Sequence, residues 1–165
     1  MTPSAGFPPI ARPDARILIL GSLPGERSIR EQQYYAHPQN AFWRIMAALF
    51  DITGEYDARA AQLCARRIAL WDVLHSSVRP GSMDADIRAD TSRPNDFAEF
   101  FACHGDIELI AFNGRKAEQL FQRFVDPLEI GARAGGASLP SPSPAYASMP
   151  FSGKLAPWRE ALQVE

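Results

Sequence analysis

Cysteine, histidine and lysine are all scarce in this chain of 165 residues. The two cysteines, Cys64 and Cys103, lie far apart, neither belongs to a CxxC pair, and the chain has only three histidines. Zinc sites built from Cys and His, and iron–sulfur clusters held by four cysteines, need more ligands at closer spacing. The sequence excludes both as purely protein-ligated sites, and we expect no metal and no cofactor.

Long apolar runs are also absent, and none approaches the roughly 20 residues of a membrane-spanning helix. Hydrophobic residues make up 46% of the chain and charged residues 22%, which is typical of a globular protein. The first 16 residues, MTPSAGFPPIARPDAR, lack the basic start and the apolar centre of a signal peptide. The sequence predicts one compact domain in the cytoplasm, with no membrane partner, and we expect a monomer.

Positive charge is carried by fifteen arginines but only two lysines, Lys116 and Lys154, and the formal net charge is -2. A negative balance is not typical of a protein that binds DNA by charge alone. Arginine suits bidentate contacts with phosphate, although GC-rich coding also enriches a chain in arginine. The composition leaves both explanations open.

Short apolar runs alternate with helical patterns along the chain. We expect buried strands over 16–20, 68–74 and 107–112 and before Leu139, and helices over 41–50, 57–67, 94–105, 115–124 and 155–163, with Asn40 as the first N-cap. This alternation predicts an α/β fold: a single-domain three-layer sandwich with a central, mostly parallel four-stranded sheet and helices on both faces. Residues 1–15 are rich in proline without periodicity, so we expect an irregular N-terminal arm and a domain over 16–165.

Ligands of such sheets bind beyond the carboxyl ends of the strands. This rule directs attention to the loops after Leu20, Trp71, Phe112 and Leu139. The last loop, 138–154, is rich in proline and serine and lies inside the domain, which favours a rigid functional loop over a linker.

Four segments stand in an order found in one family of enzymes. They are ILGSLPGERSIREQQYYAHPQNAFW (19–43), LWDVLHSSVRPGSMDADI (70–87), IAFNGRKAEQLF (110–121) and LPSPSPAYA (139–147). In this order they resemble the uracil-DNA glycosylase superfamily, and within it the hypoxanthine-DNA glycosylase branch (family 6). The AHPxNxFW portion of the first segment also resembles the mismatch-specific uracil-DNA glycosylases.

The resemblance implies a monofunctional glycosylase of base excision repair. It would flip a deaminated base (hypoxanthine, with uracil and xanthine as further candidates) out of double- or single-stranded DNA, hydrolyse the N-glycosidic bond and leave an abasic site. Cleavage builds positive charge on the sugar and negative charge on the departing base, so polar neutral groups can suffice. Neither Lys116 nor Lys154 lies in a motif that would form a Schiff base.

The resemblance further implies that Asn40 of the HPxNxFW segment is the catalytic residue, although a purely capping role would also explain it. Leu23 stands where other branches carry a catalytic aspartate or asparagine, so the chemistry has to come from elsewhere. Ser22 and Gly25 beside it can hold water, base or phosphate.

Besides Ser22 and Leu23, which are expected to contact the substrate from the first motif, three residues are expected to bind the base. Tyr35 matches a position where relatives place an aromatic ring against the flipped base, but it could also be a core tyrosine. Asp72, at the end of a strand, would accept the ring N–H of hypoxanthine, or else cap the following turn. His75 would donate to the base or a phosphate, or serve a structural role.

The expected DNA contacts lie in the segment 139–147, called the Pro–Ser loop below, and at Lys154. Ser141 and Ser143 match positions that grip the phosphate backbone. Ala145 occupies the position of the wedge that fills the vacated stack but is too small, whereas the adjacent Tyr146 is large enough. Lys154 is a candidate phosphate contact, or part of a solvated helix face.

Two alternatives remain open at this stage. One is a mismatch-specific uracil-DNA glycosylase, and the other is a DNA lesion-binding module without catalysis, which Leu23 would suit. A serine hydrolase is disfavoured because GSLPG does not fit the GxSxG pattern of a nucleophile elbow.

Overall fold

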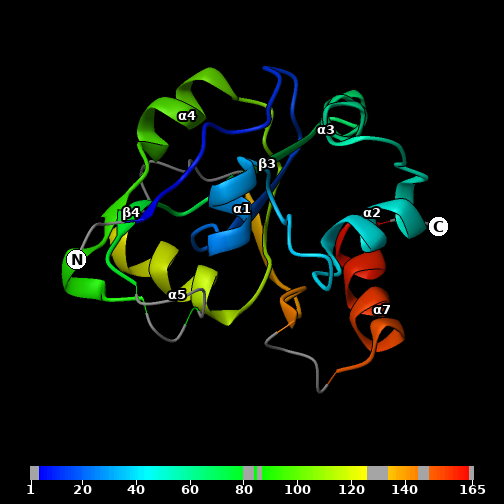
Figure 1. Cartoon of the computed structure of the whole chain (residues 1–165). Helices are drawn as coiled ribbons and strands as arrows, with labels where there is room; N and C mark the ends of the chain where they lie inside the picture. Colours follow the sequence, from blue (N-terminus) through cyan, green and yellow to red (C-terminus); the bar gives the residue numbers. More distant parts are fainter. Residues whose placement is uncertain (1–3, 80–83, 85–86, 126–133, 145–148, 164–165) are drawn as a thin grey trace.

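The computed structural model of the chain describes residues 4–79, 84, 87–125, 134–144 and 149–163 (Figure 1). The strands are β1 (Ser4–Ala5), β2 (Ile17–Gly21), β3 (Ile68–Asp72), β4 (Leu74–Ser77), β5 (Arg93–Pro94), β6 (Leu109–Phe112) and β7 (Gly135–Ser138). The helices are α1 (Glu26–Glu31), α2 (Phe42–Phe50), α3 (Tyr56–Ala65), the 3-10 turn η2 (Ala89–Thr91), α4 (Phe97–Cys103), α5 (Arg115–Phe124) and α7 (Phe151–Ala161). None of these helices is long and apolar enough to span a membrane.

The central sheet has four parallel strands in the order β3-β2-β6-β7. Strand β2 pairs with β3 from Ile17–Ile68 to Gly21–Asp72, and on its other side with β6. Its run of Ile and Leu is almost completely buried, as expected for a strand covered on both faces. The predicted parallel sheet is confirmed.

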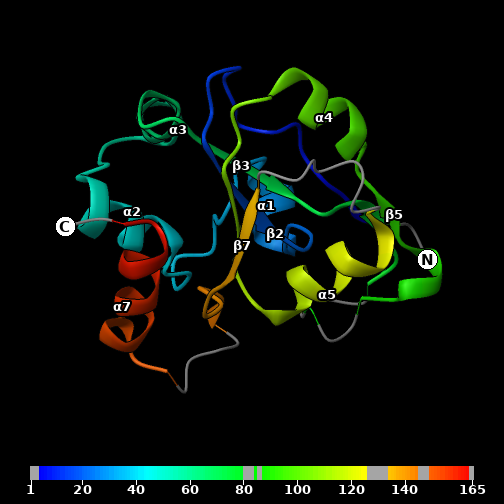
Figure 2. The same ribbon diagram turned by 180° about the vertical axis from the view of Figure 1, so that it is seen from behind.

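Helices cover both faces of this sheet. Helices α4 and α5 lie on one side of it, and α2, α3 and α7 lie on the other, in both views of the molecule (Figures 1 and 2). On the first side the ring of Phe112 lies 5.2 Å from that of Phe121, and on the second Phe42 meets Trp158 edge-on at 6.1 Å. The predicted three-layer sandwich is therefore confirmed.

A second, antiparallel sheet in the order β1-β4-β5 was not predicted from the sequence. Ser4 and Ala5 pair with the end of β4, and Ile10 forms a bridge with Leu70 of the central sheet. Apart from these pairings, residues 4–15 form no helix or strand, so the N-terminal segment is largely irregular but is joined to both sheets. Strands of two residues are too short to show any periodicity.

The predicted helices are present, α5 with the predicted ends and the others with shifted ends. Helix α7 begins at Phe151, four residues before the predicted start, and α4 begins at Phe97, where Asp96 accepts a hydrogen bond from the Glu99 N–H. Helix α1 was missed because its six residues, ERSIRE, contain one apolar side chain.

The strand order also locates a crevice. The chain leaves β2 for β3 on one side and later returns to β6 on the other, so the loops after β2 and β6 diverge at the carboxyl end of the sheet. Open parallel sheets bind their ligands at such a switch point.

Candidate active site

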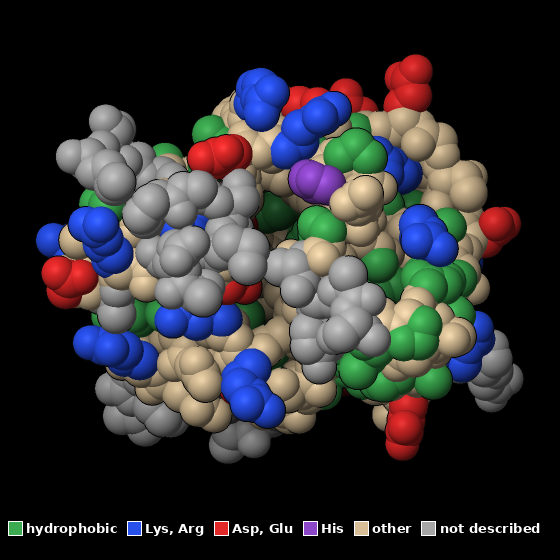
Figure 3. Space-filling view, turned by 60° about the horizontal axis from the view of Figure 1, so that its bottom comes forward, with side chains coloured by type: hydrophobic (Ala, Val, Ile, Leu, Met, Phe, Trp, Pro, Cys, Tyr) green, Lys and Arg blue, Asp and Glu red, His purple; other side chains and the backbone are tan. Residues whose placement is uncertain are grey.

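A cavity of about 310 Å³ lies at this end of the sheet. Its walls come from residues 21–28, the segment 34–40, the ends of β3 and β6, Asp84, and residues 141–144 of the Pro–Ser loop. The face shown in Figure 3 is hollowed near its centre, with Lys and Arg side chains spread around the hollow. The cavity volume is within the range of small-molecule sites.

Gly21 forms the floor of the cavity. A Cβ atom at this position would lie 2.5 Å from Oδ1 of Asp72, 3.1 Å from the Tyr35 hydroxyl and 3.2 Å from Nδ2 of Asn113. Three polar groups from three separate segments therefore converge above a residue that has no side chain. The glycine is needed for space, because any side chain would occupy the place where they meet.

Asp72 is the most unusual group in the cavity. The residue is 4% exposed, and its Oδ2 atom has no hydrogen-bond partner among the described residues. Burial raises the pKa of Asp72 from 3.8 to about 7; the charge of Asp84 adds to this rise and Arg79 opposes it. The position agrees with the predicted base contact, but the carboxyl can carry a proton near neutral pH.

Tyr35 presents an aromatic surface to the cavity. Its ring stacks on Phe42 at a centroid distance of 4.2 Å and an angle of 22°, and its hydroxyl accepts a hydrogen bond from Nδ2 of Asn113. Burial raises the pKa of the Tyr35 phenol well above its ordinary value, so the phenol is uncharged. Tyr34 instead donates its hydroxyl hydrogen to the Pro8 carbonyl at 2.9 Å, in the core.

Asn40 lies at the start of α2 and lines the cavity. Its Oδ1 atom accepts a hydrogen bond at 2.9 Å from the N–H of Phe42, the first residue of α2. The N-cap position is Ala41, one residue after the predicted Asn40, but this bond satisfies a free N–H at the helix start as a capping side chain does. The next residue, Ala41, donates its N–H to the Pro142 carbonyl at 2.9 Å and so ties the helix start to the Pro–Ser loop. Asn40 lines the cavity, and no described residue accepts a hydrogen bond from its Nδ2. This amide group can therefore donate to a ligand.

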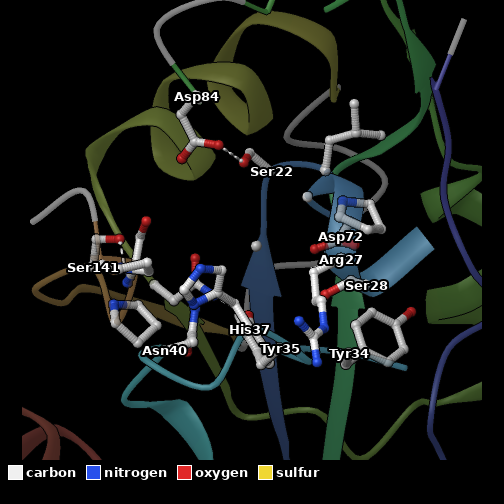
Figure 4. Close-up of a pocket in the computed structure, with 18 of the residues that line it drawn as sticks. Ser22, Arg27, Ser28, Tyr34, Tyr35, His37, Asn40, Asp72, Asp84 and Ser141 are labelled. Carbon is white, nitrogen blue, oxygen red and sulfur yellow. Dashed lines mark hydrogen bonds between the residues drawn. The ribbon is translucent and has the colours of Figure 1, made fainter. Parts of the chain in front are cut away.

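Ser22 and Asp84 form a pair on the wall opposite Asn40 (Figure 4). The Ser22 hydroxyl donates to Oδ1 of Asp84 at 2.6 Å, and Nη1 of Arg79 lies 3.9 Å from the same oxygen. Ser22 is thus in the cavity as expected, but its hydroxyl hydrogen is committed to Asp84. Leu23 is buried and supplies apolar lining.

The Pro–Ser loop is braced from within. Ser141 and Ser143 both line the cavity, and Oγ of Ser141 accepts the Ser143 N–H at 3.2 Å. Lys154, 5% exposed, directs Nζ at the Ser143 carbonyl at 3.4 Å, and burial lowers its pKa. In contrast to the surface phosphate contact expected from the sequence, Lys154 supports the loop from below. Ala145 and Tyr146 lie outside the described residues.

His75 is not brought to the cavity. It is exposed and lines a separate depression beside Trp71, Phe100 and His104. Side chains alternate along a strand, so a residue three positions beyond Asp72 on the next strand, β4, has no reason to share its direction. The structure therefore gives no support to a base contact by His75.

Sequence reasoning missed Asn113, Asp84 and His37, all of which line the cavity. Asn113 directly follows β6, so the rule on strand ends could have identified it. Asp84 lies 12 residues beyond β3 in a polar segment and carries no such signal. Within the part of the chain that the structure describes, no cluster of three or more His, Cys, Asp or Glu could hold a metal ion.

The fold and the cavity place the chain in a known class. The family model of the Uracil DNA glycosylase superfamily matches residues 8–164, nearly the whole chain. The chain belongs to this superfamily and is a DNA glycosylase, as predicted from the sequence.

Individual relatives indicate a branch within this superfamily. The chain is 39% identical over 115 residues to a hypoxanthine DNA glycosylase of Methanosarcina barkeri (strain Fusaro), and 42% identical over 117 residues to one of Methanosarcina acetivorans. Each match covers 68% of this chain and 72% of the relative. A solution NMR structure of a candidate uracil DNA glycosylase from Methanosarcina acetivorans superposes with a TM-score of 0.78 at 35% identity, over 98% of this chain and 99% of that one. These names agree with the predicted branch.

Proposed function

We propose that the chain removes hypoxanthine from DNA by hydrolysing its N-glycosidic bond, leaving an abasic site. The observation that carries the proposal is the meeting of Asp72, Tyr35 and Asn113 above Gly21, in a chain whose relatives are named hypoxanthine DNA glycosylases. A flipped purine would enter the cavity with its ring against Tyr35 and its N–H edge toward Asp72.

Asn40 is proposed as the catalytic residue. The departing base takes the electron pair of the broken bond, and a fixed donor at the base stabilises that negative charge. The Asn40 Nδ2 amide is such a donor, already oriented because Oδ1 is held by the Phe42 N–H. A water molecule then adds to the anomeric carbon of the sugar, and the proton that this water loses is balanced by the proton that the departing base takes up. The hydrolysis is complete without a covalent enzyme intermediate.

The Pro–Ser loop is proposed to hold the DNA. Ser141 and Ser143 would bind phosphate oxygens, with Lys154 fixing the Ser143 backbone beneath them. The wedge role of Tyr146, in place of the small Ala145, remains a prediction. We also expect a monomer in the cytoplasm that acts on double- or single-stranded DNA.

The proposal is tested by release of free base from oligonucleotides that each contain one hypoxanthine, uracil or xanthine, paired or mispaired, with and without EDTA. We expect the fastest release from hypoxanthine, no effect of EDTA, and unbroken abasic strands. Release confined to mispaired uracil would instead identify a mismatch-specific uracil glycosylase. Binding to the lesion without release would identify a binding module.

Tyr35→Ala should slow base release about 5- to 150-fold on duplex and single-stranded substrate alike, because stacking contributes roughly 1 to 3 kcal/mol per base. Tyr35→Phe keeps the ring and loses only the acceptor for Asn113, so its rate should stay within a few-fold of wild type. Single-turnover rates on both substrates, with melting temperatures, decide the matter. A Tyr35→Ala variant as active as wild type would show that Tyr35 is a core residue and does not stack on the base.

A further inference from the structure

The side chain of Asp72 has no cation within hydrogen-bond distance in the described part of the structure. Its Oδ2 atom is buried without a partner among the described residues. Its Oδ1 atom lies over Gly21, as do the Tyr35 hydroxyl and Nδ2 of Asn113. A buried carboxylate with no partner carries a large desolvation cost, whereas the uncharged acid avoids most of it. The geometry therefore favours the protonated form.

The charges around Asp72 act in the same direction on balance. Asp84 is negative and raises the pKa of Asp72, while Arg79 lowers it. The Arg79 guanidinium, however, donates to the Pro24 carbonyl and lies 3.9 Å from Asp84, so its charge is shared. The other titratable or charged side chains that line the cavity are Glu26, Arg27, Tyr34, Tyr35 and His37.

A carboxylic acid and a carboxylate offer different edges to a base. The acid has an O–H donor beside a C=O acceptor, whereas the carboxylate only accepts. Deaminated bases carry a lactam edge, in which a ring N–H stands next to a carbonyl oxygen. The acid pairs with this edge through two hydrogen bonds, but the carboxylate would bring its second oxygen against the base carbonyl.

We infer that Asp72 works as a neutral carboxylic acid and recognises the lactam edge of the flipped base through a pair of hydrogen bonds. The inference rests on the proposed function and adds that the Asp72 carboxyl is protonated. Asp72 then donates one hydrogen bond to the base and accepts another. It also gives a partner to Oδ2, which has none among the described residues: the protonated oxygen would donate a hydrogen bond to the base carbonyl. The recognised class comprises bases with a lactam edge.

The kinetic test compares wild type with Asp72→Asn, because the carboxamide is a fixed mimic of the neutral acid. With a pKa of about 7, single-turnover release of hypoxanthine by wild type should fall roughly 30-fold between pH 6 and pH 8.5. Asp72→Asn should lack this fall and exceed wild type at pH 8.5. Asp84→Asn removes the neighbouring negative charge and should move the fall to lower pH. A wild-type rate that is flat or rises through pH 7 would overturn the inference.

A second measurement does not depend on base release or on any variant. The side-chain carboxyl carbon of Asp72, assigned by through-bond NMR correlation to its own backbone, is titrated in the free wild-type protein. We expect a midpoint near neutral pH. A midpoint near pH 4 would overturn the inference even if hypoxanthine were released normally, whereas a neutral midpoint with no release at any pH would reject the proposed function alone.

Discussion

Asn40→Ala should lower the single-turnover rate of base release by about 100- to 1000-fold, the usual cost of losing one donor that stabilises a transition-state charge. Asn40 lines the cavity, and the substitution removes its Nδ2 amide together with the acceptor for the Phe42 N–H. Loss of the cap alone costs only about 0.5 to 2 kcal/mol of stability. The rate and the melting temperature are therefore measured on the same preparation.

Asn40→Asp is the matched control for this residue. Aspartate caps a helix as well as asparagine does, so the variant keeps the structural role and loses the amide donor. We expect Asn40→Asp to melt close to wild type and to be nearly as inactive as Asn40→Ala. An Asn40→Asp enzyme as fast as wild type would assign Asn40 to the cap and leave the catalytic donor to another residue.

Gly21→Ala should reduce base release at least about 100-fold. The new methyl group would lie 2.5 Å from Oδ1 of Asp72, closer than two such atoms can approach, and also within 3.2 Å of the Tyr35 and Asn113 polar atoms. The groups that form the floor must move apart, and displacements of about 1 Å in an active site can cost 100-fold in rate. Overpacking of this kind also costs roughly 1 to 3 kcal/mol of stability.

Gly105→Ala provides the comparison, because a Cβ at Gly105 would meet no heavy atom of the described residues within 4 Å. This variant should match wild type in rate and in melting temperature. If Gly21→Ala released base as fast as Gly105→Ala, the cavity floor would not be where the base is read.

The central sheet could be predicted because strands that are buried on both faces are apolar along their whole length, and this pattern is visible in the sequence. The runs ILIL and IALW are continuously apolar, which is typical of strands that are covered on both faces. Part of the cavity wall also followed from the sequence, because Asp72 is the last residue of β3 and Ser22 directly follows β2. Polar residues at the carboxyl ends of these neighbouring strands lie at the switch point of the sheet, where ligands bind.

The remaining features depend on contacts between distant segments. Lys154 donates to the Ser143 carbonyl, and Asp84 accepts from Ser22, which is 62 residues away in the sequence. No pattern in the sequence around Lys154 or Asp84 indicates these contacts. The raised pKa of Asp72 is likewise a property of its surroundings, since an aspartate in an exposed turn would titrate near its ordinary pKa of 3.8. Sequence alone identified the residue but not the shift of its pKa.

The most direct measurement of the central claim counts both products of one reaction. Excess wild-type enzyme is incubated with a duplex that contains a single hypoxanthine, and free hypoxanthine and abasic sites are quantified in parallel, with Asn40→Ala alongside. The account predicts equal amounts of free base and abasic site, with the strand unbroken, and almost no product from Asn40→Ala. Absence of free hypoxanthine from wild type, or equal release by Asn40→Ala, would contradict it.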